Sequence, residues 1–226
     1  MGFLGAGVLA TWNDIAPGDE AEFNDWYTRE HVPERVGVPG FLRGRRYLAA
    51  SGSPMYLALY ETEQVDTLAS AEYLRRLNNP TPSTRRVLPL FRNFIRATCR
   101  VTLSLGRGVG GALAAVRLGP LPGREDQLRA WLTATILPAL VERPEIVGAH
   151  LCEADPSIAR IPTDEQKLRG VQDVTPRWIV LAEGTGVEAV DAGWRRVVGT
   201  DELGQHGAAP DAAVGIYRLL YSLDRR

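Results

Sequence analysis

Several chemically informative residue types are scarce in this chain of 226 residues. It has two cysteines, Cys99 and Cys152, outside any CxxC, and three histidines without the spacing of metal ligands. We therefore expect no metal site, and reduced thiols in a cytoplasmic protein. No apolar run reaches the ~18 residues that a membrane-spanning helix needs. The start of the chain also lacks the basic region of a secretory signal.

The chain also lacks an excess of charge of one sign, and it lacks nucleotide-binding motifs. The formal net charge is -1, so there is no electrostatic reason to expect nucleic acid or a membrane as partner. A glycine-rich stretch at 106–111 precedes a strand-like run, whereas a dinucleotide-binding loop opens a helix. We interpret this stretch as a linker. A GxSxG nucleophile motif is absent too.

What the sequence does contain is an internal repeat. A shift of 105 residues, without a gap from Val8 to His150, aligns Pro17-Gly18 with Pro122-Gly123, Trp26 with Trp131, Thr28 with Thr133, Pro33 with Pro138, Val36 with Val141 and Pro39 with Pro144. Residues 56–61 match 178–183 at a shift of 122. The difference between the two shifts, 122 - 105, indicates an insertion of about 17 residues within 155–176. We expect this insertion to form a surface loop or lid.

Both halves show the element order β-α-β-β-α-β. Strands are expected over 4–12, 41–49, 55–62 and 95–105 in the first half, and over 113–118, 146–153, 177–183 and 214–223 in the second. Such a unit is ferredoxin-like, with helices on one face of a four-stranded antiparallel sheet. We therefore divide the chain into a first repeat, 1–106, and a degenerate second repeat, 107–226. Packing the two bare sheet faces together predicts an α+β fold with an intramolecular eight-stranded antiparallel barrel and helices outside. Such a barrel is wide enough for side chains or one small ligand.

The repeat draws attention to His31, in the segment 22–47. Its copy is Ile136, and the copy of Glu30 is Thr135. The same scaffold thus accepts an apolar residue where the first half has a histidine. An imidazole titrates near neutral pH, so His31 is a candidate general acid or base. The alternative is a structural histidine bonded to a backbone carbonyl at a helix end. On an ideal helix the side chain of Glu30 would point ~100° away from that of His31, so a carboxylate that orients the imidazole would come from elsewhere.

Alternation along 41–48 predicts two different faces. The even positions are small or apolar at Leu42 and Gly44, which suits packing beneath a helix. The odd positions are polar and differ between the halves, which is typical of residues that line a ligand pocket. They are Arg43, Arg45 and Tyr47 in the first half, and their copies in the second are Gly148, His150 and Cys152.

Each of these side chains has a functional and a structural interpretation. Arg43 and Arg45 could clamp a carboxylate or enolate, or could pair with Glu61 or with surface carboxylates. Tyr47 and Tyr60 could donate to a developing oxyanion, or could be packing aromatics. Glu61 recurs in the second half as Glu183, which favours structural ion pairs for both glutamates.

The first half contains a recognisable motif. Phe23-x-x-Trp26-Tyr27-x-x-Glu30-His31-x-Pro33, followed by Val38-Pro39-Gly40-Phe41 and Arg45-Arg46-Tyr47, resembles the EthD-like branch of the dimeric α/β-barrel superfamily. Members usually build the barrel from two chains. The resemblance therefore implies a barrel within one chain here, which could still form a homodimer. The second half lacks the histidine of the motif, which implies one active pocket per chain.

The resemblance and the residues together predict a cofactor-free enzyme of isomerase, cyclase, lyase or monooxygenase type. It would act on a small hydrophobic or oxygenated molecule in a barrel pocket. We expect catalysis by His31, Arg45 and Tyr47, and substrate binding by Trp26, Tyr27, Glu30, Arg43, Tyr60 and His150. One alternative is a non-catalytic binding or stress-type protein of the same fold. A third is a haem protein with His31 or His150 as the axial ligand.

Overall fold

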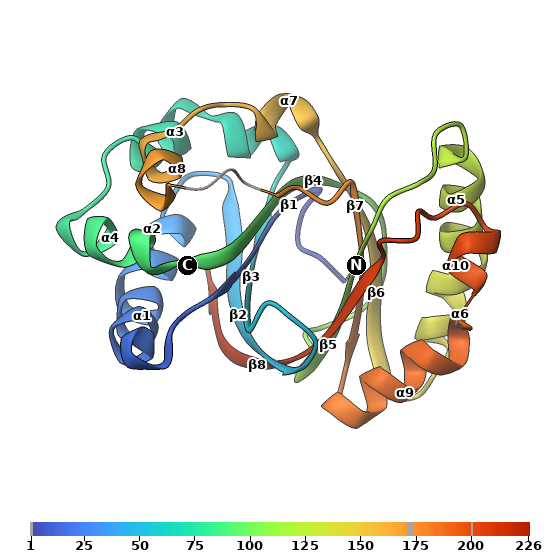
Figure 1. The fold of residues 1–226 in the computed structure, drawn as a ribbon. Coiled ribbons are helices and arrows are strands. Elements are labelled where there is room, and N and C mark those ends of the chain that lie inside the picture. The colour runs from blue at the N-terminus through green and yellow to red at the C-terminus, as the bar shows by residue number, and fades with distance from the viewer. Residues whose placement is uncertain (1, 171–173, 200) are drawn as a thin grey trace.

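A closed antiparallel barrel forms the centre of the computed structural model, which describes residues 2–170, 174–199 and 201–226 (Figure 1). The barrel order is β1-β3-β2-β8-β5-β7-β6-β4 within these ranges. The strands are β1 (Gly7–Asp14), β2 (Phe41–Ser51), β3 (Tyr56–Thr62), β4 (Arg92–Gly106), β5 (Ala112–Leu118), β6 (Ile146–Ala154), β7 (Trp178–Gly184) and β8 (Ala213–Asp224).

The barrel divides into two similar halves. Strands β1–β4 lie together in the order β4-β1-β3-β2, and β5–β8 follow the matching order β8-β5-β7-β6. The halves join where β2 pairs with β8 and β4 pairs with β6, both antiparallel. The predicted α+β fold, an eight-stranded barrel made of two ferredoxin-like repeats, is therefore confirmed.

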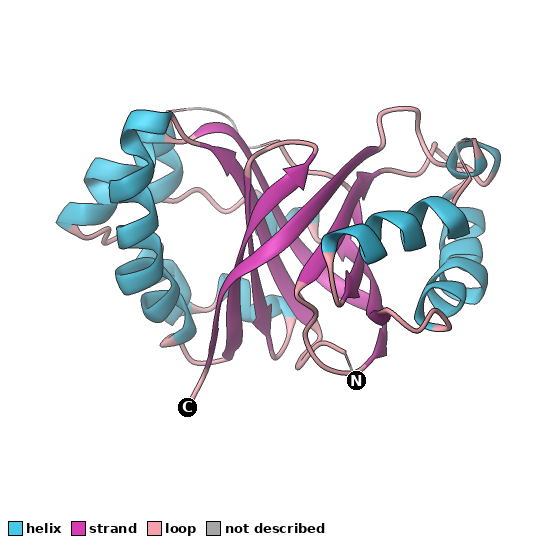
Figure 2. Ribbon diagram, turned by 90° about the horizontal axis from the view of Figure 1, so that it is seen from below, coloured by secondary structure: helices cyan, strands magenta, loops and turns pink. Residues whose placement is uncertain are grey.

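Helices cover the outside of the barrel in two separate layers (Figures 1 and 2). The first layer contains α1 (Glu20–Trp26), α2 (Val32–Val36), α3 (Ala71–Leu77) and α4 (Pro82–Val87), with short turns η1 (Pro17–Asp19), η3 (Val65–Ala69) and η4 (Leu88–Leu90). The second contains α5 (Glu125–Trp131), α6 (Leu137–Val141), α9 (Val187–Val197) and α10 (Glu202–Gln205). None of the helices in the described ranges is long and apolar enough to cross a membrane.

The inserted segment does not lie over its own repeat. It forms α7 (Pro156–Ala159) and α8 (Asp164–Arg169), which lie beside the helices of the first repeat (Figure 1). Its residues 171–173 are outside the described ranges. A piece of the second half thus covers the first half.

Each repeat has a π-helical turn in its first helix. These turns are η2 (Tyr27–His31) and η5 (Leu132–Ile136), and in η2 the amide of Val32 donates to the carbonyl five residues before it. Pro33 and Pro138 follow the two turns at matching positions. A proline in a regular α-helix would clash with the carbonyl four residues earlier, and the wider turn avoids this contact. Because both repeats have it, the π turn belongs to the scaffold and does not by itself mark a site.

The barrel interior holds packed side chains and not the hollow that we expected. Strand residues from both repeats form one buried cluster there: Val8, Ala10, Trp12, Tyr47, Leu57, Leu59, Ala97, Cys99, Leu113, Ala115, Cys152, Ile179, Leu181 and Tyr217. An eight-stranded barrel is only wide enough for its own side chains when several are large, and this one includes a tryptophan and two tyrosines. The expectation of a ligand pocket inside the barrel was therefore wrong.

The N-terminal segment closes one end of this interior. We expected a strand from Leu4, but β1 begins at Gly7. Phe3 instead belongs to the interior cluster, and its ring stacks on His150 with 4.0 Å between the centroids. The amide of Leu4 donates to the Glu61 carboxylate at 2.7 Å.

Candidate functional site

The candidate site is a cavity of about 40 Å³ outside the barrel, between the sheet of the first repeat and its helices. Strands β1, β3 and β4 form its floor, and η2, α2, α3 and α8 form its walls. The lining residues are Leu9, Thr11, Tyr27, His31, Arg35, Tyr60, Tyr73, Leu77, Leu88, Phe91, Phe94, Arg96, Ala159, Ile161, Thr163, Glu165, Gln166 and Arg169. A pocket for a small molecule is typically several hundred Å³, so a ligand of that size does not fit this cavity unless a wall moves.

His31 is buried in the wall of the cavity, at 8% exposure. Its ring packs on Trp26 at a centroid distance of 4.3 Å and meets the Tyr27 ring nearly edge-on at 5.0 Å. Its Nδ1 has no hydrogen-bond partner among the described residues. Burial lowers the pKa of His31 well below 6.5, and the charges of Arg35 and Arg46 lower it further. The imidazole is therefore neutral near pH 7 and can accept a proton.

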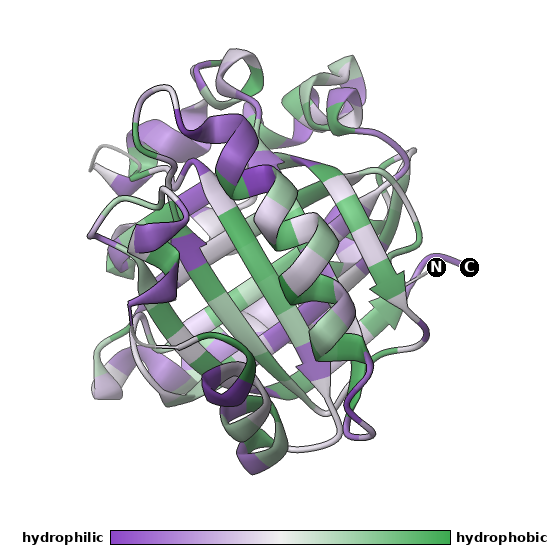
Figure 3. Ribbon diagram, turned by 90° about the vertical axis from the view of Figure 1, so that its right-hand side faces the viewer, coloured by the Kyte–Doolittle hydropathy of each residue, from purple (hydrophilic) through white to green (hydrophobic). Residues whose placement is uncertain are grey.

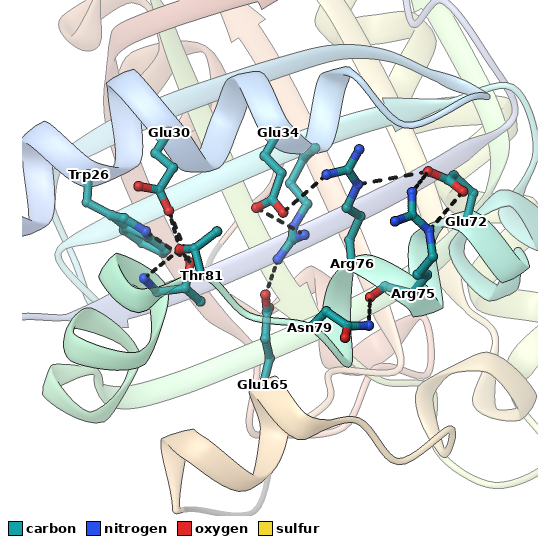
Figure 4. A network of polar contacts seen from close by, with 11 residues as sticks. Trp26, Glu30, Glu34, Glu72, Arg75, Arg76, Asn79, Thr81 and Glu165 are labelled. Atoms are coloured by element: carbon teal, nitrogen blue, oxygen red, sulfur yellow. Dashed lines mark hydrogen bonds and ion pairs between the residues drawn. The ribbon is translucent and has the colours of Figure 1, made fainter.

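Arg35 lies one helical turn after His31 and is itself almost completely buried. Its Nη2 donates to the carboxylate of Glu165, which reaches in from α8, and its Nη1 lies 3.6 Å from Glu34 (Figure 4). The guanidinium also lies 5.7 Å from the centre of the Tyr73 ring. Burial alone would lower the pKa of Arg35, but Glu165, Tyr73 and Glu34 together outweigh it and raise that pKa. The cavity wall thus contains a permanent cation.

Arg46 fixes the helix from the sheet side. Its guanidinium stacks over the Tyr27 ring at 4.4 Å and donates at 2.8 Å both to Thr28 Oγ1 and to Asn24 Oδ1. This side chain comes from β2 and is buried. It therefore holds the helix that carries His31 at a fixed position on the sheet.

Two buried tyrosines, Tyr27 and Tyr60, line the floor of the cavity. The hydroxyl of Tyr27 lies 3.5 Å from Thr11 Oγ1, and that of Tyr60 has no hydrogen-bond partner among the described residues. Burial raises the pKa of Tyr27 and of Tyr60. Both phenols therefore keep their protons at neutral pH and can donate hydrogen bonds to an oxygen atom in the cavity.

The inserted segment forms the lid of this cavity. Besides the contact of Glu165 with Arg35, the amide of Asp164 donates to Asn78 Oδ1 at 3.0 Å, and the Arg169 guanidinium lies 4.2 Å from the centre of the Phe94 ring. The lid helix α8 has six residues. One repeat thus supplies the cavity and the other supplies its cover.

The structure brings some of the predicted site residues together. His31, Tyr27 and Tyr60 line the cavity, and Trp26 packs on His31 while its Nε1 donates to Thr84 Oγ1 at 3.2 Å. Glu30 points elsewhere, as helical geometry predicted, and accepts a hydrogen bond from the Thr81 hydroxyl of the neighbouring segment (Figure 4).

Three other predicted residues lie inside the barrel, on the opposite face of the sheet from His31. Arg45 bridges Glu61 (Nη2 to Oε1, 3.0 Å) and Glu183 (Nη1 to Oε2, 2.7 Å). His150 lies 3.4 Å from Glu183, and the hydroxyl of Tyr47 is buried nearby in the same interior. Burial raises the pKa of Glu183, but Arg45 and His150 outweigh it and lower this pKa to about 2.

Arg43 is also separated from His31. It lies near the start of β2, where its Nε donates to Asp224 at 2.6 Å and its Nη1 is 3.8 Å from Glu61. The alternation along β2 was predicted correctly. What was wrong was the assumption that the face carrying Arg43, Arg45 and Tyr47 would enclose the same pocket as His31, because the helices cover the other face.

Sequence reasoning missed Arg35, Arg46 and Glu165 as site residues. The signal for the two arginines was the one that identified His31: their copies in the second repeat are Leu140 and Leu151. Glu165 lies in the insertion, which has no copy in the first repeat, so its contact could not be inferred from the repeat.

The equivalent interface in the second repeat is apolar at the positions that match the polar ones of the first. Pairing confirms the equivalence, since Leu9 of β1 faces Tyr60 of β3 as Ala114 of β5 faces Ala182 of β7. The six polar positions of the first interface are Thr11, Tyr27, His31, Arg35, Arg46 and Tyr60. Their counterparts Val116, Leu132, Ile136, Leu140, Leu151 and Ala182 all belong to the apolar cluster under α5, α6 and α9. Figure 3 shows this hydrophobic side of the sheet beneath its helices.

The donor groups do not favour a metal ion. In the described ranges, no group of three or more His, Cys, Asp or Glu side chains is placed to hold a metal ion. Burial raises the pKa of both Cys99 and Cys152, which keeps them as thiols. Of the two histidines considered as axial ligands, His31 packs between Trp26 and Tyr27, and His150 lies inside the packed barrel, 3.4 Å from Glu183.

Comparison with known proteins gives structural relatives only. No family model matches the chain, and no curated protein matches it. An anthrone oxidase-like protein superposes with a TM-score of 0.61 at 12% identity, covering 97% of this chain and 92% of that one. A candidate monooxygenase from Fusobacterium nucleatum subsp. nucleatum superposes at 0.62 with 10% identity, covering 99% and 96%. A candidate chlorite dismutase gives 0.56 at 10% identity, covering 95% and 94%.

At these identities the likeness concerns the fold, and it extends over nearly the whole length of each chain. In this chain the superposed fold is a closed eight-stranded barrel with helices on its outside. The chain therefore has a dimeric α/β-barrel fold, built here from two repeats of a single chain.

Proposed function

We propose that the protein is an enzyme that removes a proton from a small, hydrophobic, oxygenated molecule, with neutral His31 as the base. The observation that carries this proposal is the contrast between the two interfaces, polar at six positions in one repeat and apolar at all six in the other. Burying polar groups costs stability unless all are paired. The second repeat shows that the scaffold does not need them, which supports a chemical role in the first.

The arrangement suits general-base catalysis. An imidazole whose Nδ1 is unpartnered among the described residues can accept a proton from an acidic C–H or O–H group. The phenols of Tyr27 and Tyr60 can donate to the oxygen of the resulting anion, and the positive charge of Arg35 stabilises it in surroundings that exclude water. In this arrangement His31 takes the proton, and the two phenols and Arg35 stabilise the negative charge that its removal leaves on the ligand.

Proton removal is the first step of isomerisation and also of oxygenation by O₂ without a cofactor. The fold neighbours named as a candidate monooxygenase and as anthrone oxidase-like support the second course. For a methylene between two aromatic rings, the balanced reaction is CH₂ + O₂ → C=O + H₂O, with O₂ as the oxidant. We include in this proposal that the chain belongs to the EthD-like branch, on the motif around His31.

A non-catalytic ligand-binding protein of the same fold is the second candidate. The closed cavity of about 40 Å³ and its lid favour it, because they would equally suit storage or transport of a small molecule. The two candidates differ in whether a bound molecule exchanges protons with His31.

The test uses anthrone as a probe, in D₂O without oxygen, with exchange of its methylene hydrogens followed by proton NMR. We expect the enzyme to accelerate exchange, and His31→Ile, which copies the second repeat, to lower the accelerated rate by about 10²- to 10⁴-fold. His206→Ile is the matched control, because that histidine stacks on Trp131 at 4.2 Å in the other layer. Equal rates for the native protein and His31→Ile would reject His31 as the base. Binding of anthrone without any exchange would favour the second candidate.

A further inference from the structure

The cavity next to His31 contains a buried cation whose partner comes from the lid. We propose that this pocket selects molecules with an anionic oxygen group, a carboxylate or phenolate, and that this group replaces Glu165 of α8 on the guanidinium of Arg35. The inference rests on the proposed function only in placing the ligand in the same cavity. It adds the charge of the ligand and the residue that recognises it.

Arg35 has the position of a ligand-binding residue. It lies four residues after His31, so both side chains project from the same side of the helix, and both line the cavity. Arg35 is 1% exposed. In the second repeat the same position is Leu140, buried in the apolar cluster. Packing of this helix on the sheet therefore does not require a guanidinium.

The guanidinium is only partly used by Glu165. Its Nη2 donates to Glu165, whereas Nη1 has no hydrogen-bond partner within the described ranges, with the nearest oxygen of Glu34 at 3.6 Å. A carboxylate that approaches Arg end-on can accept from both nitrogens. A ligand in the cavity could thus make the bidentate contact that Glu165, reaching in from α8, does not make.

Because the lid must open for a ligand to bind, the affinity depends on the charge of that ligand. A ligand larger than a few water molecules cannot enter about 40 Å³ unless the lid moves. When α8 leaves, Glu165 leaves with it, and Arg35 becomes a buried cation without its main partner. Such a cation is costly, and an anionic ligand restores the pair where a neutral ligand of the same shape does not. The lid carboxylate therefore acts as an internal competitor that only an anion can replace at low cost.

The experiment compares two probes of matched shape, 1-naphthoate and 1-naphthamide, by isothermal titration calorimetry on the full chain. Glu165→Gln keeps the size of the lid side chain but removes the competing charge. Asp164→Asn is the matched control, because it removes one charge from the same helix at an exposed carboxylate that pairs with Lys167. We expect Glu165→Gln to bind 1-naphthoate at least about tenfold more tightly than the native chain. We expect 1-naphthamide affinity to stay within about twofold, and Asp164→Asn to behave as native.

The proposal would be overturned if Glu165→Gln increased the affinity for 1-naphthoate and for 1-naphthamide equally. It would also be overturned if Glu165→Gln and Asp164→Asn changed the affinity for 1-naphthoate by the same factor. Lack of binding of either probe to Glu165→Gln would overturn it as well. The double variant Arg35→Gln/Glu165→Gln leaves no unpaired charge and should lose the preference for 1-naphthoate; if it keeps the preference, another residue recognises the anion. Binding needs no proton transfer. Selectivity for 1-naphthoate without exchange of anthrone hydrogens would therefore keep this inference and reject the proposed function, and the opposite result would do the reverse.

Discussion

The two helix-covered faces of the barrel have the same backbone plan and opposite chemistry. Both have a helix with a π turn followed by a proline, and both pack that helix on antiparallel strands in matching register. At the six matching positions the second face has only apolar side chains, whereas the first has a threonine, a histidine, two arginines and two tyrosines. The second face shows what the fold requires, so the first shows what has been added to it.

The difference teaches which buried polar groups are structural. Glu61 of β3 and Glu183 of β7 are equivalent, and both turn into the barrel, where Arg45 pairs with each of them. Polar groups present in both repeats therefore belong to the closure of the barrel. His31 and Arg35, whose counterparts Ile136 and Leu140 are apolar, belong to the cavity.

The largest effect should follow from copying Leu140 into the first face. Arg35→Leu leaves the Glu165 carboxylate buried without its main partner. The free energy of unfolding should therefore fall by about 3–5 kcal/mol, measured by urea denaturation. The double variant Arg35→Leu/Glu165→Leu should recover most of this loss, because an apolar pair of similar volume replaces the ion pair. A loss below about 1 kcal/mol in the single variant would mean that the pair contributes little and that the lid is not held by it.

Two single variants, His31→Ile and Ile136→His, should affect the free energy of unfolding differently. Ile136→His places an imidazole among aliphatic side chains and should lower the free energy of unfolding by about 1–3 kcal/mol. His31→Ile should leave it unchanged within about 1 kcal/mol or raise it, because it removes a polar group whose Nδ1 has no partner in the described chain. Thermal and urea unfolding of the two variants check this. A larger loss for His31→Ile than for Ile136→His would identify His31 as a structural residue.

Much of the fold could be predicted because duplication makes the pattern visible twice. The matching prolines after the first helix of each half, Pro33 and Pro138, fixed the register before any strand was considered. The side-chain alternation of β2 was then enough to assign Tyr47 to one face and Gly44 to the other. Gly44 lies beneath the helix, where an added Cβ would be 2.8 Å from Val32.

The site was less predictable because the sequence does not state which face of a sheet has room. Polar residues on the inner face suggested a hollow, but Arg45 fills that space by pairing with Glu61 and Glu183. The cavity formed on the outer face, where His31 lines it. The lid contact of Glu165 depends on where a 17-residue insertion crosses from one repeat to the other, which local patterns do not encode.

The neutral state of His31 predicts a dependence of stability on pH. Its pKa is well below 6.5 in the folded chain and about 6.5 in the unfolded chain. Below about pH 6.5 the unfolded chain therefore binds a proton that the folded chain does not, and stability falls as the pH decreases. Relative to His31→Ile, the native chain should lose about 1 kcal/mol between about pH 7.5 and pH 5.5.

Urea denaturation of both proteins at the two pH values isolates this contribution, because His150 and His206 are common to both and cancel. A constant difference between the two proteins would show that His31 titrates alike in the folded and unfolded chains. In that case it would be exposed to water and not held in the wall of a closed cavity.

The smallest effect should come from the charges that distinguish the two helices on their outer sides. Asp25 and Arg29 form an ion pair at 2.7 Å, with side chains 65% and 81% exposed, and their copies are Ala130 and Ala134. Exposed pairs contribute little because water and salt screen them. The double variant Asp25→Ala/Arg29→Ala should therefore change the free energy of unfolding by less than about 0.5 kcal/mol in urea denaturation. It should also leave anthrone exchange at the native rate. A clear loss of exchange would extend the functional difference between the repeats from the buried side of this helix to its solvent side, and the cavity alone would no longer account for it.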